Sequence, residues 1–211
     1  MSKKVRKYVD YVIKGIYAGI MIGIGAVVLL SNSNNVLGAF FFSIGLLMIC
    51  MYGMNLYTGK VGYILINKFD YVYELVLSLI GNFIGTFIVG RLVLLTRISG
   101  ISERANAISM VKLNDSLLSI FILSIFCGML MYIAVNNYKK VNNDFGKYLS
   151  IFMCVMVFIL CGFEHCIANM AYFTIGGVWS FDALLCLIIM ILGNSVGSIV
   201  IAFFYNLYYK N

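Results

Sequence analysis

Apolar runs of membrane-spanning length constrain this chain more than any other feature. Of its 211 residues, 63% are hydrophobic and only 11% are charged, whereas a soluble domain carries about 25% charged residues. About 20 predominantly apolar residues suffice to cross a bilayer as a helix. The six runs that we expect to span a membrane are residues 11–30, 36–66, 72–95, 116–135, 148–173 and 181–205. We therefore predict an all-α, polytopic membrane protein with a single transmembrane domain over residues 1–211.

Lysine and arginine residues are divided unequally between the two ends of these spans. Ten lie on the side of both chain termini, namely Lys3, Lys4, Arg6, Lys7, Lys14, Lys68, Lys139, Lys140, Lys147 and Lys210. Four lie on the other side, namely Arg91, Arg97, Arg104 and Lys112. Because basic residues favour the cytoplasmic side, we predict a multi-pass protein of the cytoplasmic (inner) membrane with both termini in the cytoplasm. Residues 97–115 would then form an external loop. Basic residues at span ends do not form the one-sided patch of a nucleic-acid-binding protein, so we expect no nucleic-acid partner.

Two of the six spans are interrupted by glycine and polar residues. The second span contains the stretch from Gly53 to Lys60, and the fifth contains the stretch from Gly162 to Met170. Non-helical backbone at membrane depth is tolerated where it lines a cavity. The span after each interruption carries Gly-Asn-x-x-Gly, at residues 81–85 and 193–197.

This pattern predicts two copies of a three-span unit, at about residues 11–95 and 116–205. Because three is odd, the second copy must be inverted relative to the first. Inverted repeats with paired broken helices place a permeation site near the middle of the membrane, between the two breaks.

Glu164 and His165, the only histidine of the chain, are adjacent in the second interruption. A charge at mid-membrane costs about 2.5–3.5 kcal/mol or more, so ionisable residues there usually face a cavity on a transport path. By the repeat, Thr58 of the first interruption would line the same pore. The alternative is that Glu164 and His165 are buried and hydrogen-bonded, and only join two helices.

Other chemistries fit the residues less well. The six cysteines lie in or beside apolar runs, which indicates buried free thiols. Cys161, His165 and Cys166 could belong to a metal site, but the chain has no second histidine to complete it. A membrane enzyme that uses Glu164, His165 and Cys166 is disfavoured because adjacent helical residues point in different directions. We expect no metal, no cofactor and no enzyme.

The stretch Gly162–Met170, read as Gly-Phe-Glu-His-Cys-Ile-Ala-Asn-Met, resembles the fifth-span signature of the formate/nitrite transporter family. Asn55–Gly59 is similar to the family's second-span loop, and the likeness covers nearly the whole chain. The resemblance implies an aquaporin-like fold and a homopentamer with one pore per protomer, in contact with membrane lipid. It also implies a channel or transporter for small monovalent weak-acid anions: formate, nitrite or hydrosulfide.

The resemblance implies roles for single residues as well. The residues expected to contact the solute are His165, Thr58, Lys112, Glu164 and Asn169. The residues expected to form apolar constrictions are Leu46 and Phe158 on the cytoplasmic side of the histidine, and Tyr57 and Met131 on the outer side. Lys112 would attract the anion in the outer vestibule, and Glu164 is expected to accept hydrogen bonds from backbone N–H groups at the break. His165 would donate a hydrogen bond or a proton, so that the solute passes with a proton or as the neutral acid.

Three residues depart from the family's pattern. Gly128 lies where many members have asparagine in the fourth span, Asn55 lies where an acidic residue is frequent, and Lys60 replaces asparagine or a small residue. These changes leave the choice of anion open. An aquaporin-like channel for a neutral solute is the alternative function, although the chain has no proline and therefore no Asn-Pro-Ala signature.

Overall fold

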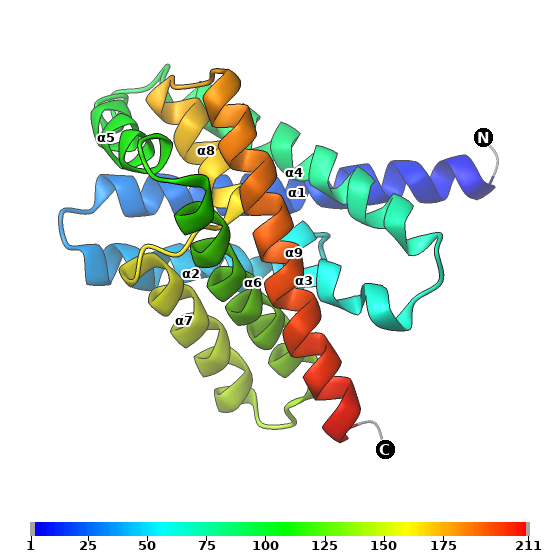
Figure 1. The fold of residues 1–211 in the computed structure, drawn as a ribbon. Coiled ribbons are helices and arrows are strands. Elements are labelled where there is room, and N and C mark those ends of the chain that lie inside the picture. Colours follow the sequence, from blue (N-terminus) through cyan, green and yellow to red (C-terminus); the bar gives the residue numbers. More distant parts are fainter. Residues whose placement is uncertain (1–2, 210–211) are drawn as a thin grey trace.

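The computed structural model describes residues 3–209, and these residues form helices joined by short turns (Figure 1). The first half contains α1 (Lys3–Ser31), α2 (Asn35–Met51), α3 (Tyr57–Lys60), the 3-10 helix η1 (Val61–Ile66) and α4 (Tyr71–Val93). The second half contains α5 (Ile101–Leu113), α6 (Leu117–Lys140), α7 (Asp144–Leu160), α8 (Cys166–Gly176) and α9 (Phe181–Tyr209). No strand occurs within residues 3–209, so the all-α class predicted from the sequence is confirmed.

Four of these helices are long and apolar enough to cross a membrane, namely α1 from Val5 onward, α4, α6 and α9. The apolar helices α2 and α8 are shorter. Helix α5 lies in the region expected to be an external loop. The predicted side of the two termini is not tested by the fold, and Lys210 lies outside the described residues.

Glycines let the long helices pack in pairs, α1 against α4 and α6 against α9 (Figure 1). A Cβ atom on Gly19 would lie 2.2 Å from the carbonyl oxygen of Asn82 in α4. A Cβ atom on Gly128 would lie 2.1 Å from the carbonyl oxygen of Asn194 in α9. Small residues at such contacts let two backbones approach closely, which is a common way of packing helices in membranes.

Helices α2 and α7 end in the same way. Each is followed by a glycine with a positive φ, Gly53 at 63° and Gly162 at 69°. The next N–H group reaches back into the helix, from Met54 to the Ile49 carbonyl and from Phe163 to the Phe158 carbonyl, at 2.9 Å in both cases. This is the hydrogen bond of a Schellman cap, in which glycine takes the left-handed conformation at no steric cost. The two interruptions thus begin with one backbone motif.

The asparagine of each Gly-Asn-x-x-Gly segment holds one interruption in place. In the first half, Asn82 Oδ1 accepts from the Tyr57 N–H at 2.9 Å. Its Nδ2 donates to the carbonyl oxygens of Gly15 at 2.9 Å and Asn55 at 2.8 Å. One buried side chain therefore joins α4 to α1 and to the start of α3.

Asn194 makes the equivalent three bonds in the second half. Its Oδ1 accepts from the Cys166 N–H at 2.9 Å, and its Nδ2 donates to the carbonyls of Ser124 at 2.8 Å and Glu164 at 2.7 Å. Both asparagines are fully buried. Polar backbone groups that lie outside a helix need such partners when no water can reach them.

Candidate functional site

His165 and Thr58 come together although they belong to different halves of the chain. The His165 Nε2 and Thr58 Oγ1 atoms are 2.8 Å apart, and both residues are buried. His165 is also the N-cap of α8, because its Nδ1 accepts from the Ala168 N–H at 3.0 Å. A ring that accepts at Nδ1 carries its proton on Nε2 when neutral. We therefore assign the bond as Nε2–H donating to Thr58, which leaves the Thr58 hydroxyl proton available for another acceptor.

An aromatic cluster lies against this pair. The Phe158 ring stacks on the His165 ring, with centroids 5.5 Å apart and planes at 28°. Phe42 of α2 meets Phe158 edge-on, with centroids 5.8 Å apart. The rings form an apolar wall on one side of His165.

Two cavities of similar size lie at the two interruptions. The first, of about 210 Å³, is lined by His165, Asn169, Phe158, Lys112 and Arg104, among others. The second, of about 200 Å³, is lined by Leu56, Lys60 and Lys139, among others. Leu56 is the N-cap residue of α3 and so holds the same position in its interruption as His165 does in the other.

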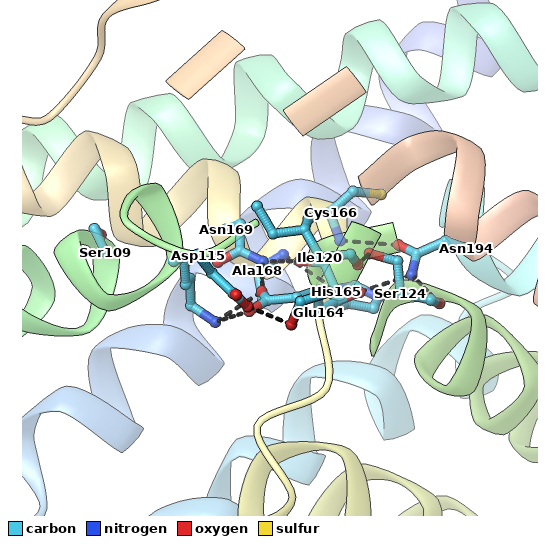
Figure 2. Close-up of polar contacts among 12 residues, drawn as sticks. Ser109, Asp115, Ile120, Ser124, Glu164, His165, Cys166, Ala168, Asn169 and Asn194 are labelled. Atoms are coloured by element: carbon cyan, nitrogen blue, oxygen red, sulfur yellow. Dashed lines mark hydrogen bonds and ion pairs between the residues drawn. The ribbon is translucent and has the colours of Figure 1, made fainter. Parts of the chain in front are cut away.

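A buried ion pair lies beside the first cavity. Lys112 Nζ donates to both carboxylate oxygens of Glu164, at 2.8 and 2.7 Å, and Asn169 Nδ2 donates to Glu164 Oε2 at 2.8 Å. The two charged side chains are only 12% and 5% exposed. In Figure 2, Glu164, His165 and Asn169 converge at the interruption. The charge of Lys112 is therefore compensated within the protein.

The role expected for Glu164 was wrong. Within residues 3–209 its carboxylate accepts from the side chains of Lys112 and Asn169, and no backbone N–H donates to it. Two backbone donors at the start of α8 are already taken, the Cys166 N–H by Asn194 and the Ala168 N–H by His165. The Glu164 carboxylate therefore pairs with Lys112 instead.

A second ion pair lies beside the second cavity. Lys60 Nζ is bonded to Glu74 of α4, and the Tyr71 hydroxyl donates to the Lys60 carbonyl at 3.0 Å. These bonds fasten the end of α3, the helix that carries Thr58, to α4. Lys60 thus helps to hold the backbone of the interruption in place and also contributes a charge there.

The constriction residues expected from the resemblance are only partly placed as expected. Phe158, expected on the cytoplasmic side with Leu46, lines the same cavity as Lys112, which was expected on the outer side. The reason is that α7 ends two residues later and the chain turns back at Gly162, which brings Phe158 against His165. The membrane side of each residue stays a prediction. Leu46, Tyr57 and Met131 are buried and are not among the residues that line either cavity. The Tyr57 hydroxyl instead lies 2.8 Å from Ser195 Oγ.

Gly128 lies where many family members have asparagine, but this position does not face a cavity. Gly128 packs against the backbone of α9, where any side chain would collide with Asn194. It lines neither cavity. The residue is therefore explained by helix packing and carries no argument about the anion.

The described part of the chain shows where the residues considered for a metal site and the thiols lie. There, no three His, Cys, Asp or Glu side chains come together in a group that could hold a metal ion. The six cysteines are free thiols, as expected, but Cys161 is exposed and Cys50 is only partly buried. Cys161 lies outside because it follows the end of α7, at the Schellman turn.

The sequence argument missed Leu56 and Phe42. Leu56 lies as far after Gly53 as His165 lies after Gly162, so the repeat itself could have indicated it. Phe42 carries no such signal, because it is one of several phenylalanines in an apolar helix.

Comparisons with known proteins agree with this architecture. The family model described as "Formate/nitrite transporter" matches residues 1–208. The "Uncharacterized transporter YrhG" of Bacillus subtilis (strain 168) is 30% identical over 148 residues, which are 65% of this chain and 56% of that protein. A "Formate-nitrite transporter" of Plasmodium knowlesi (strain H) is 26% identical over 150 residues, which are 62% of this chain and 47% of that protein. The matched part thus spans about half the length of these curated relatives.

Two solved structures share the fold. A "Pentameric formate channel with formate bound" has a TM-score of 0.83 and 25% sequence identity, and the match covers 98% of this chain and 99% of that chain. An "FNT family ion channel" has a TM-score of 0.79 at 20% identity, with 98% and 90% covered.

Proposed function

The chain belongs to the formate/nitrite transporter family, and from this premise we propose that it forms a transmembrane pore for small monovalent weak-acid anions such as formate, nitrite or hydrosulfide. In this proposal six spans cross the membrane. Helices α2, α3 and η1 make up one broken span, and α7 and α8 make up another. The two halves, residues 11–95 and 116–205, are inverted repeats with both termini in the cytoplasm. The protomers assemble as a homopentamer, like the channel of the solved structure.

The observation that carries this proposal is the position of the His165–Thr58 contact between the two interruptions. Each interruption borders its own cavity, and His165 of one interruption contacts Thr58 of the other. The walls between are apolar, with Phe158 on one side and Leu56 on the other. We propose that a solute passes from one cavity to the other at this contact, because His165 lines the first cavity and Gly59, the neighbour of Thr58, lines the second.

The pair can offer two hydrogen-bond donors to a small solute. His165 offers Nε2–H and Thr58 offers its hydroxyl proton, once their mutual bond opens. An unpaired charge in such apolar surroundings costs many kcal/mol, so a neutral acid crosses more easily than its anion. Desolvation at the contact therefore favours protonation of the solute.

The N-cap bond limits what His165 does with protons. A second proton would have to be placed on Nδ1, which already accepts from the Ala168 N–H. Removing the Nε2 proton from the neutral ring would leave an anion in an apolar site, which is costly. We therefore assign His165 the role of a neutral donor, while the proton of the acid enters from the solvent with the solute.

Uptake by liposomes that contain the purified protein tests the proposal. We expect rapid uptake of at least one of formate, nitrite and hydrosulfide, with a rate that rises as the external pH falls and the neutral acid becomes more abundant. Liposomes that carry water or glycerol well and none of the three anions would contradict the proposal. The mass of the solubilised protein tests the pentamer separately.

A further inference from the structure

The lysines that line the second cavity differ in whether a carboxylate pairs with them. Two lysines line it, Lys60 and Lys139. Lys60 is bonded to the carboxylate of Glu74, and the side chains of this pair are 22% and 14% exposed. Their charges cancel within a few ångströms, so Lys60 attracts a distant anion weakly.

Lys139 is the lysine of this cavity that has no carboxylate within ion-pair distance among the described residues. Its ammonium lies 4.2 Å from the centroid of the Tyr63 ring. Among the described residues it takes part in no ion pair, whereas Lys60 does. An aromatic face holds an ammonium through its quadrupole and leaves the net charge in place. The ring therefore positions the charge at the cavity without cancelling it.

The first cavity has a similar arrangement. There the lysine near the interruption, Lys112, is also paired with a carboxylate. The second cation, Arg104, donates within residues 3–209 only to oxygens of uncharged groups, the carbonyls of Leu30 and Asn32 and the side chain of Asn35. Each cavity thus combines one neutralised lysine with one uncompensated cation.

We propose that Lys139 is the residue that captures the small monovalent anion at the second cavity, and that Lys60 serves to fasten α3. This proposal rests on the proposed function and names a binding residue on the side of the membrane opposite Lys112. Lys139 acts before the solute reaches the apolar contact, so it raises the local concentration of the anion and leaves the crossing step unchanged. Its reach is limited by screening, about 8 Å at physiological ionic strength.

A simpler explanation is that Lys139 only complements the end of α6. Lys139 and Lys140 are both in the last turn of that helix, where positive charge is favourable. Lys140 supplies a matched control, because it is exposed at the same helix end and is not among the residues that line the cavity. A general effect of surface charge would be the same for both lysines.

The experiment compares Lys139→Gln, Lys140→Gln and Lys139→Arg in a host that lacks its own uptake of the anion. Inside-out membrane vesicles present the proposed cytoplasmic face to the solution, and whole cells present the other face. The probe is formate, nitrite or hydrosulfide, whichever the wild-type protein takes up fastest. KM and the maximal rate are measured from initial rates at low and high ionic strength.

We expect Lys139→Gln to raise KM in inside-out vesicles about threefold to tenfold, with little change in the maximal rate. This KM should also lose most of its dependence on salt. Lys140→Gln and Lys139→Arg should stay close to the wild type, and KM in whole cells should not change. Equal effects of Lys139→Gln and Lys140→Gln, or a failure of Lys139→Arg to keep the wild-type KM, would overturn the inference while the proposed function stands. A wild-type protein that takes up none of the anions would overturn both.

Discussion

At residues 52–56 and 161–165 the chain leaves helical geometry in the same way and then presents different side chains. Both segments start with a left-handed glycine and a Schellman bond, and both are held by an asparagine with three hydrogen bonds. Yet Leu56 holds in the first segment the place that His165 holds in the second. The same hydrogen bonds hold the backbone in both halves, but only the second half has an ionisable side chain at this position.

The charges near the two segments follow the same division. Each half pairs a lysine with a carboxylate, but the pairs are built from different positions. Lys112 reaches Glu164 inside the second interruption, whereas Lys60 leaves the first interruption to reach Glu74 on α4. Substitutions at matching positions can therefore distinguish residues that hold the backbone of the interruptions from residues that contact the solute.

The largest expected loss of stability comes from replacing Asn82 or Asn194, the asparagines that hold the two interruptions. Asn82→Leu and Asn194→Leu keep a branched side chain but remove three hydrogen bonds, and they leave one N–H and one non-helical carbonyl, that of Asn55 or Glu164, without a partner. At about 1–3 kcal/mol for each of these two buried unsatisfied groups, and about 1 kcal/mol for the third hydrogen bond, either variant should lose about 3–7 kcal/mol of stability. Thermal unfolding in detergent measures this loss, with the exposed Asn106→Leu as a mild control. If only one of the two variants were destabilised, the two asparagines would not hold their interruptions in an equivalent way.

A smaller effect is expected from neutralising the carboxylate of an ion pair. Glu164→Gln leaves Lys112 with an uncompensated charge in a buried site, at a cost of about 2–4 kcal/mol. Glu74→Gln should cost less, because the side chain of Lys60 is more exposed and can be hydrated. Thermal unfolding of both variants tests the order. The double variant Glu164→Gln with Lys112→Met should recover part of the loss, and no recovery would show that the charge is not the cause.

The smallest effect is expected from the two left-handed glycines. Gly53→Ala and Gly162→Ala place a Cβ atom in open space, so the cost is that of the backbone conformation alone, about 1–2 kcal/mol at each site. Gly100→Ala is a matched control, because it also meets no neighbour within 4 Å and its φ is −58°. We expect equal shifts in unfolding temperature for the first two variants and almost none for the control. Unequal shifts would mean that one interruption is held more rigidly than the other.

The positions of the two interruptions could be predicted from the sequence, because they depend on residue types that recur at matched positions. The repeated Gly-Asn-x-x-Gly and the glycine-rich interruptions located both breaks. The pairing of Lys112 with Glu164 was not readable, because these residues are 52 positions apart and the repeat has no matching pair. The cavity that Phe158 lines was not readable either, since it depends on how the chain turns back at Gly162. Local patterns thus predicted the backbone, whereas contacts between distant segments decided which side chains share a cavity.

The central claim is that His165 and Thr58 form the polar point of a pore, and uptake by assembled variants of His165 tests it. His165→Asn keeps a hydrogen-bond donor, and asparagine is also a good N-cap for α8. His165→Leu makes the second interruption resemble the first, with its Leu56, and removes the donor. We measure anion uptake in liposomes with protein of the same assembled size as the wild type. The account predicts that His165→Asn stays within about tenfold of the wild-type rate, and that His165→Leu falls about 10- to 100-fold below it. Assembled His165→Leu that transports the anion at the wild-type rate would contradict the claim.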